Sequence, residues 1–414
     1  MPSELIQKIA SDSVINRAFQ WMCERRKDYS HNDDVWDIRF RWSEVKPRLQ
    51  KTLLAGEYTF SPQTQIRIPD RTIELWGALD SLVLKAMAIV LGEQLEPVLS
   101  HKCYHLAGRG GAKAAVRATS KYLKYGHHVM KSDVRRYYAS INHEILFKRL
   151  QQYVPDRIVQ KLLWQNIRRT VYCDGFYRDV KQGISLGCPL SPLIGALYLK
   201  QLDDSMEKTG LFYARFMDDW VVIAPTRWKL RAAIRIVNET LNVLQVDKHP
   251  DKTFIGKVES GFNFLGYFLK PGFIKVAVDT IKRFTQRITQ LYEQGADIDR
   301  IGEYMRHWCR WVRSGLGGCG NIVDKEVIMN YLFFDYREDF ISCEVFSGMG
   351  INSYGLGTGL ARALRGFYAP FIHSYLHIYL YFFPFLLMSK IESLILQLVS
   401  PLWFFNKMPN ERPR

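Results

Sequence analysis

The chain lacks the cysteine patterns that mark disulfide-stabilised scaffolds and zinc-binding modules. Its 414 residues contain seven cysteines, an odd number, and no Cys-x-x-Cys pair. Small secreted domains and zinc ribbons depend on paired or closely spaced cysteines, so both classes are excluded. The opening residues, MPSELIQKIA, also lack the basic and then apolar pattern of a secretory signal. A reducing cytoplasm is therefore the simplest compartment to expect.

Acidic residues are scarce relative to basic ones. The chain has 41 aspartates and glutamates against 57 lysines and arginines, which gives a formal net charge of +16. Such an excess suits a polyanionic partner, either nucleic acid or an anionic membrane surface, and charge alone does not choose between them. An apolar content of 47% indicates a folded protein rather than a disordered one. The length allows one large domain or two to three small ones.

Two adjacent aspartates, Asp218 and Asp219, separate two apolar runs in the stretch YARFMDDWVVIAP. The runs predict a β-hairpin with both acids at its tip. Side by side, the two charges repel one another and lose hydration, and a pair of divalent cations would offset both costs. Asp133 ends a predicted strand in HHVMKSD and is the candidate third carboxylate. The alternative is an ordinary solvated turn, in which Asp-Asp pairs are common.

Periodicity predicts a mixed α+β chain. Residues 59–75 are expected to be extended, and 261–269 to form a hairpin. Residues 78–99 predict a strongly amphipathic helix, and a turn-rich loop over 183–193 leads into another helix over 194–206. Further helices are expected over 109–126, over 143–153 with Asn142 as its cap, over 229–244, and from about residue 279.

Five segments occur in a familiar order: SDVRRYYASI, GCPLSPLIGALYLKQLD, ARFMDDWVV, HPDKTFIG and GFNFLGYF. Together they resemble the successive motifs of reverse transcriptases, most closely the bacterial group II intron-like kind, over roughly residues 55–320. The resemblance implies a right-hand polymerase with a small antiparallel sheet and helices behind it. Its expected parts are an N-terminal helical extension (1–54), fingers and palm (55–278), a helical thumb (279–330), and a Gly-rich linker with an apolar helical C-terminal region (331–414).

The resemblance also implies roles for single residues. Asp133, Asp218 and Asp219 match the carboxylates that bind two Mg²⁺ ions for nucleotidyl transfer. Lys252 matches a lysine that protonates the leaving pyrophosphate, and its alternative is a surface lysine. Tyr138 matches the aromatic residue that excludes a 2′-hydroxyl, and its alternative is a core aromatic.

Further positions concern the nucleotide. Arg71 lies where the family has a residue that contacts the triphosphate, with Arg67 as a rival, and both could instead be solvated loop arginines. The chain departs from the family at Leu186, which precedes Gly187 and replaces a glutamine that helps to position the incoming nucleotide. Because leucine cannot donate that hydrogen bond, altered nucleotide selection or processivity is expected.

The segment YMRHWCRWVRSGLG predicts a nucleic-acid-binding helix. Basic and aromatic side chains alternate at helical spacing, as in Arg306, Trp308, Arg310 and Arg313. This pattern suits a grip on the phosphates of an RNA·DNA duplex. A packed amphipathic helix with solvated arginines is the alternative, and both can hold at once.

The implied activity is RNA-directed DNA synthesis from dNTPs, giving cDNA on a partner RNA that is expected to be a cognate non-coding RNA. No nuclease or zinc-binding pattern follows residue 330, so self-propagation by target cutting is not expected. Bacterial reverse transcriptases without such modules include retron enzymes, diversity-generating enzymes and the antiphage defence group. The upstream segment of about 60 residues and the long C-terminal extension resemble the defence group. A template-independent nucleotidyl transferase and a non-catalytic, RNA-binding, maturase-like protein remain alternatives.

An apolar region follows, in which Phe367–Ser389 contains no lysine, arginine, aspartate or glutamate. Across 367–405 this region fits a membrane contact, a buried helix pair, or an interface with another copy or a partner protein. A membrane-acting effector, with the polymerase as its sensor, is a fourth hypothesis for the chain.

Overall fold

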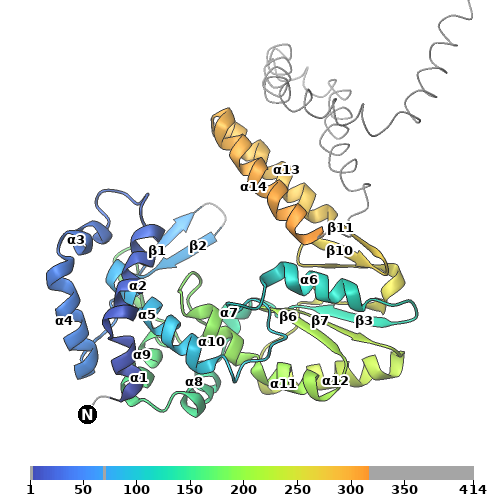
Figure 1. Ribbon diagram of the computed structural model, residues 1–414, viewed down its shortest axis with the longest axis horizontal. Helices are drawn as coiled ribbons and strands as arrows, with labels where there is room; N and C mark the ends of the chain where they lie inside the picture. Colours follow the sequence, from blue (N-terminus) through green and yellow to red (C-terminus); the bar gives the residue numbers. More distant parts are fainter. Residues whose placement is uncertain (1–2, 69–70, 317–414) are drawn as a thin grey trace, which may run out of the picture. The chain divides into compact units, whose positions relative to one another are not determined.

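The computed structural model describes residues 3–68 and 71–316 (Figure 1). The predictions for the linker and apolar region, 331–414, lie outside the described residues, as does the end of the predicted thumb. The chain divides into two compact units, of which the first comprises residues 1–295 and 301–324. Within the described residues, all of the strands belong to that unit and form three small sheets. The expected mixed α+β character is confirmed.

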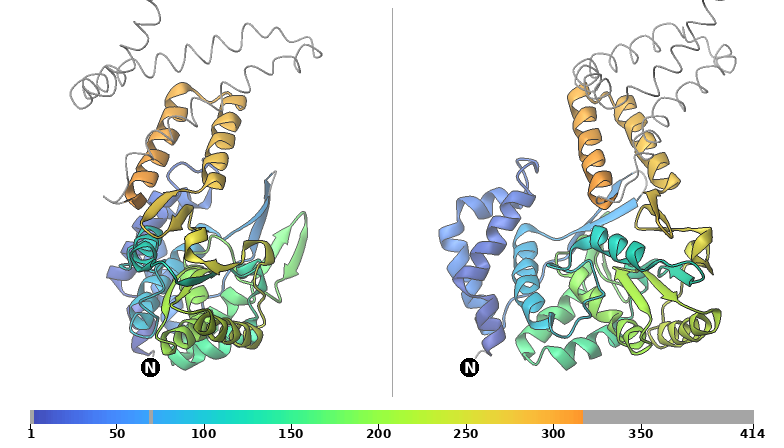
Figure 2. Two further views of the ribbon diagram at one scale, coloured as in Figure 1. Left: turned by 90° about the vertical axis from the view of Figure 1, so that its right-hand side faces the viewer. Right: turned by 45° about the vertical axis from the view of Figure 1, so that its right-hand side comes forward.

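The central sheet carries the predicted aspartate hairpin. Its strand order is β6-β7-β3-β8, and every neighbouring pair is antiparallel. Helices α11 and α12 cover one face and α6 the other (Figures 1 and 2). Because both faces are covered, β7 is buried from its second residue onward. The strands are β3 (His128–Ser132), β6 (Phe212–Phe216), β7 (Asp219–Ala224) and β8 (Phe254–Lys257).

A second sheet has the order β2-β1-β4-β5. The segment predicted to be extended forms the β1–β2 hairpin, and β1 also pairs in parallel with β4, which the sequence did not indicate. A third sheet, β11-β10-β9, contains the predicted hairpin and one additional strand. The strands are β1 (Gln63–Ile68), β2 (Arg71–Leu75), β4 (Thr170–Cys173), β5 (Phe176–Asp179), β9 (Phe262–Phe264), β10 (Tyr267–Lys270) and β11 (Phe273–Val276).

Helix α5 (Ala78–Leu95) is not the amphipathic surface helix that its spacing predicted. Buried side chains lie on nearly every face of it, among them Leu82, Val83 and Leu84 in succession. The reason is that helices α1, α2 and α3 of the N-terminal segment pack against it. They are α1 (Glu4–Ile9), α2 (Asp12–Arg25) and α3 (Asp34–Phe40), and α4 (Trp42–Ala55) follows them.

Other helices follow the sequence more closely. The predicted cap of α8 is confirmed, since the Asn142 side chain accepts hydrogen bonds from the N–H groups of Glu144 and Ile145. The helix expected over 194–206 starts earlier, at Ser191, and breaks at Leu199 into two helices. The set comprises α6 (Gly111–Tyr122), α7 (Tyr137–Ser140), α8 (His143–Tyr153), α9 (Arg157–Ile167), α10 (Ser191–Tyr198), α11 (Lys200–Lys208) and α12 (Arg227–Val243).

Two long helices complete the described fold, α13 (Val278–Glu293) and α14 (Ile298–Leu316). The ring of Phe284 on α13 stacks on Trp308 of α14 with 4.0 Å between centroids. Because α13 begins at Val278, the helix expected from about residue 279 is confirmed. Within residues 3–68 and 71–316, no helix is both long and apolar enough to cross a membrane.

Candidate active site

The three predicted carboxylates meet at one end of the central sheet. Strands β6 and β7 are joined by Met217 and Asp218, and Asp219 is the first residue of β7. Asp133 directly follows β3, whose last residue pairs with Trp220. Because β3 and β7 are antiparallel, the end of one strand lies beside the start of the other. This topology brings Asp133 to the turn although it is more than eighty positions away in the chain.

Burial sets the electrostatics of this turn. Desolvation, and then the negative charges of Asp219 and Asp133, raise the pKa of Asp218 to about 6. Asp133 is 3% exposed, and its Oδ1 accepts no hydrogen bond within the part of the chain that the structure describes. A buried carboxylate oxygen without a partner is costly unless a cation or a donor reaches it.

Two lysine ammonium groups partly neutralise the acids. Lys252, in the short 3₁₀ helix η1 (Pro250–Lys252), donates from Nζ to Asp133 Oδ2 at 2.7 Å, and this hydrogen bond raises the pKa of Lys252. Lys131 Nζ lies 3.1 Å from Asp219 Oδ1. The sequence analysis missed Lys131, although it lies two residues before Asp133, which is the spacing of one strand face.

The carboxylates fit Mg²⁺ by chemistry. Magnesium prefers hard oxygen ligands, and Asp133 Oδ1 is a buried oxygen in need of a positive partner. Among the residues that the structure describes, no group of three or more acid, histidine or cysteine side chains is arranged so that it could hold a metal ion. Asp133, Asp218 and Asp219 would hold the ions, which supply Lewis-acid stabilisation of phosphoryl oxygens when bound.

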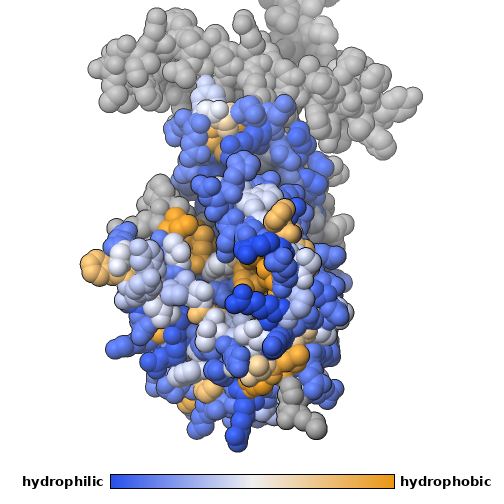
Figure 3. All heavy atoms as spheres, turned by 90° about the vertical axis from the view of Figure 1, so that its left-hand side faces the viewer, coloured by the Kyte–Doolittle hydropathy of each residue, from blue (hydrophilic) through white to orange (hydrophobic). Residues whose placement is uncertain are grey.

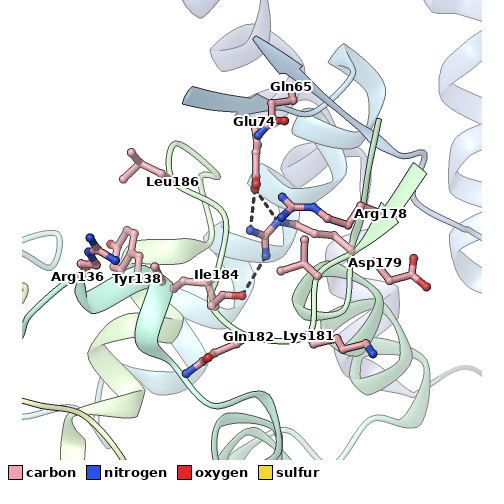
Figure 4. A pocket seen from close by; sticks show the side chains of 14 residues that line it. Gln65, Glu74, Arg136, Tyr138, Arg178, Asp179, Lys181, Gln182, Ile184 and Leu186 are labelled. Atoms are coloured by element: carbon pink, nitrogen blue, oxygen red, sulfur yellow. Dashed lines mark hydrogen bonds and ion pairs between the residues drawn. The ribbon is translucent and has the colours of Figure 1, made fainter. Parts of the chain in front are cut away.

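A cavity of about 650 Å³ is lined by Tyr138, which lies five residues after Asp133 in the chain (Figure 4). Tyr138 and Leu186 stand on one side of it, and both line it together with residues of the second sheet. Burial and then the charge of Asp218 raise the pKa of Tyr138 to about 12, which reflects how near the phenol is to the acids. A Cβ at Gly195 would lie 3.2 Å from the Tyr138 ring, so glycine leaves room for the ring there.

Arg169 braces the far wall of this cavity. Its guanidinium donates to Glu74 at 2.7 and 3.1 Å and to the carbonyl of Gly183 at 3.0 Å. These contacts tie β2 to the loop that carries Leu186. Neither Arg169 nor Glu74 was predicted from the sequence, because their partners lie far away along the chain.

Leu186, at which the chain departs from the family motif, is 54% exposed at the rim of the cavity. Gly187 beside it has a φ of 90°, a conformation that favours glycine. Buried Ser185 anchors the loop, since its hydroxyl accepts from Gln63 Nε2 at 2.7 Å. The loop is therefore held by the buried side chain of Ser185, while the side chain of Leu186 is exposed.

The remaining predicted residues fall into two groups. Arg67 and Arg71 lie at the end of the β1–β2 hairpin, where Arg67 pairs with Thr72 and Arg71 with Ile68, and their side chains lie outside the described part. On α14, the side chains of Arg306, Arg310 and Arg313 are exposed. Trp308 is half-buried against Phe284, so its ring serves the packing of the two helices.

An α+β domain with carboxylates at a hairpin turn is the arrangement that the sequence motifs imply. Residues 78–269 match the family described as "Reverse transcriptase (RNA-dependent DNA polymerase)". This part of the chain is therefore a reverse transcriptase domain, and the resemblance inferred from the five motifs is confirmed.

The chain is also similar to individual proteins. It is 24% identical over 268 residues to Protein YkfC of Escherichia coli (strain K12), covering 53% of this chain and 70% of that protein. It is 21% identical over 171 residues to the Putative COX1/OXI3 intron 1 protein of Saccharomyces cerevisiae, covering 39% of this chain and 20% of that protein. The chain is 22% identical over 167 residues to a second yeast protein, the Putative COX1/OXI3 intron 2 protein, and the match covers 39% of this chain and 19% of that protein. The chain thus spans about a fifth of the yeast intron proteins.

Proposed function

We propose that this chain is an RNA-directed DNA polymerase that makes cDNA on a partner RNA by two-metal nucleotidyl transfer. The observation that carries the proposal is the convergence of Asp133, Asp218 and Asp219 at one end of the central sheet, together with a cavity of about 650 Å³ that Tyr138 lines. This convergence joins β3 to the β6–β7 turn within a reverse transcriptase domain.

The parts of a right-hand polymerase are assigned on the same basis. The central sheet with α6, α11 and α12 is the palm, the sheet of β1, β2, β4 and β5 belongs to the fingers, and α13 with α14 is the thumb. In this assignment the N-terminal helices α1 to α4 form the extension before residue 55.

The side chains then take the following roles. The three aspartates hold two Mg²⁺ ions. Lys252 is near enough to the acids to give its proton to the leaving pyrophosphate, a cation beside a developing anion. Tyr138 limits the sugar, and Leu186 and Gly187 border the nucleotide. Arg71, with Arg67 as its rival, contacts the triphosphate, and the three arginines of α14 hold duplex phosphates.

Several predictions rest on the sequence alone. A role in antiphage defence, a cytoplasmic location, an oligomer or partner protein, and a membrane contact through 367–405 stay predictions. The cognate RNA also stays to be identified.

The decisive experiment supplies purified chain with a primer, an RNA of defined sequence, dNTPs and Mg²⁺, and sequences the product. Complementary DNA is expected from the natural chain. Asp218→Asn and Asp219→Asn keep the side-chain volume but remove a metal-binding charge, so a loss of about 10³-fold or more is expected. Asp251→Asn is the matched control, because Asp251 is 87% exposed and lies next to Lys252.

The alternatives predict different products. A homopolymer that ignores the RNA sequence would identify a template-independent transferase. Retained RNA binding without any DNA product, in the natural chain and in the variants alike, would identify the non-catalytic protein. Full synthesis by either aspartate variant would overturn the metal assignment.

A further inference from the structure

The residue before the paired aspartates has an unusual backbone. Met217 has a φ of 56°, in the left-handed region that side chains other than glycine rarely adopt. Such a conformation costs roughly 1 kcal/mol or more and persists only where the surroundings hold it. Because Met217 directly precedes Asp218, whatever holds its backbone also sets the position of the metal-binding turn.

Both polar groups of the Met217 backbone are held by side chains. Its N–H donates to Nδ1 of His105 at 2.9 Å, and its carbonyl accepts from Nη1 of Arg215 at 2.7 Å. Since Nδ1 is an acceptor here, the proton of the ring must lie on Nε2, which is 3.1 Å from the carbonyl of Pro192. His105 therefore bridges the aspartate turn and the start of α10.

The surroundings keep this imidazole neutral. Burial, and then the positive charge of Arg215, lower the pKa of His105 to about 4. Arg109 also disfavours the charged ring. At ordinary pH the ring thus remains an acceptor at Nδ1.

Further hydrogen bonds hold Arg215 and the segment that carries His105 in place. Arg215 is fully buried, and it donates to Asp203 from Nε at 2.7 Å and from Nη2 at 2.5 Å. The segment that carries His105 adds to the free edge of β6, because the Tyr104 N–H donates to the Arg215 carbonyl at 2.8 Å and the Arg215 N–H to the Lys102 carbonyl at 2.9 Å. The ring is therefore fixed to the same strand whose turn it holds.

We propose that His105 is a positioning residue for the metal site, which holds the strained Met217 peptide so that Asp218 and Asp219 share their cations with Asp133. This inference rests on the proposed function. It assigns a role in metal affinity to a side chain that acts through the Met217 backbone and lies 112 positions from Met217 in the chain.

Two substitutions separate the two hydrogen bonds of the ring. In His105→Asn, Oδ1 takes the place of Nδ1 and can still accept from the Met217 N–H. In His105→Gln, the amide nitrogen takes the place of Nε2 and can still donate to Pro192, while the Met217 N–H loses its acceptor. Both variants keep a neutral polar side chain.

The readout is metal binding by the whole chain, followed with Mn²⁺ alone by electron paramagnetic resonance, beside the Mg²⁺ requirement and the dNTP KM of DNA synthesis. In His105→Gln, Mn²⁺ affinity is expected to fall about tenfold, and the Mg²⁺ concentration for half-maximal rate to rise about as much. The dNTP KM should stay within about twofold. Metal binding by His105→Asn should stay within about threefold of the natural chain.

The outcomes are distinct. Natural Mn²⁺ affinity in His105→Gln would overturn the inference and leave the proposed function standing. Equal losses in both variants, together with equally lowered thermal midpoints, would show a purely structural role and also overturn it. If the natural chain neither bound Mn²⁺ nor made DNA while folded, the proposed function would fail and the inference with it.

Discussion

Tyr138 lines the cavity, and its ring lies beside Gly195. Burial and then the negative charge of Asp218 raise the pKa of its hydroxyl. In the proposed function this ring limits the volume available to the sugar. We expect Tyr138→Ala to raise ribonucleotide incorporation relative to deoxyribonucleotide by about 10- to 100-fold, because the steric exclusion of one oxygen is lost. Single-nucleotide extension with competing rNTP and dNTP measures the ratio. Tyr138→Phe, which keeps the ring, is the control, and an unchanged ratio in Tyr138→Ala would place the gate elsewhere.

Leu186 is exposed at the rim of the same cavity, where its side chain can donate no hydrogen bond. Leu186→Gln supplies an amide. We expect the dNTP KM to fall about fivefold, since one hydrogen bond contributes about 1 kcal/mol. Steady-state extension on a defined template measures the change, with Leu186→Met as the apolar control. Identical kinetics in all three proteins would show that this position does not contact the nucleotide.

Asp80 is a buried acid outside the site. It is 4% exposed, Oδ1 accepts from the Tyr58 hydroxyl at 2.6 Å, and burial raises its pKa to about 6 from the ordinary 3.8. A raised folded-state pKa means that the folded state binds the proton more tightly than the unfolded chain. The resulting stabilisation is fully present below about pH 4 and is lost as pH rises through about 6.

We therefore expect the natural chain to gain about 2 kcal/mol over Asp80→Asn as pH falls from about 7 to 4.5. Urea unfolding at several pH values measures both free energies, and the difference cancels the titration of distant groups. A difference that stays constant across this range would show that Asp80 keeps an ordinary pKa.

At the scale of elements, one lysine joins helix α6 to helix α14. Lys113 Nζ donates to the carbonyl of Trp311 at 2.6 Å and lies 3.5 Å from the centre of the Trp311 ring. Arg117, one turn later on α6, donates to the carbonyl of Ser314 at 3.0 Å. Basic side chains of α6 thus contact carbonyl groups in the last two turns of α14, where positive charge suits the helix dipole.

We expect Lys113→Ala to lower the free energy of unfolding by about 1–2 kcal/mol, through loss of a cation–π contact and a charged hydrogen bond. Amide hydrogen exchange in the last turns of α14 should rise with it. Lys121→Ala on the same helix is the matched control, because Lys121 is exposed. Equal effects of the two substitutions would contradict the specific role of Lys113.

Local sequence patterns predicted some helices and strands better than others. The β6–β7 hairpin, α12 and the start of α13 follow from local periodicity, because their buried faces repeat at the period of a strand or helix. The parallel pairing of β1 with β4 joins Gln63 to Val171, and no local pattern encodes a contact at that separation. Helix α5 has a nearly continuous apolar pattern, and only the packing of α1, α2 and α3 explains it.

At the scale of the whole molecule, the positive net charge indicates a polyanionic partner. The net charge is +16, and the face drawn in Figure 3 is mostly hydrophilic with small apolar areas. Binding to a polyanion releases counterions, so affinity should fall as salt rises. The exposed arginines of α14 are the side chains proposed to carry much of this effect.

We expect the triple variant Arg306→Ala, Arg310→Ala, Arg313→Ala to weaken binding of an RNA·DNA duplex and to reduce the slope of log affinity against log salt by about 2–3. Fluorescence anisotropy at several salt concentrations measures both. The control removes the same charge from exposed residues of α2 and α4, with Arg25→Ala, Arg48→Ala and Lys51→Ala. Equal slopes for the two triple variants would mean that net charge alone matters.

The sequence by itself determined the reverse transcriptase domain and the order of its motifs, and it predicted the three aspartates, because each motif is a local run whose residue types carry its chemistry. Only the tertiary structure decided which side chains surround them. Lys131, His105 and Arg215 reach the turn through pairing between strands and through the added edge segment. Such contacts depend on how distant segments pack, and residue order along the chain does not specify that directly.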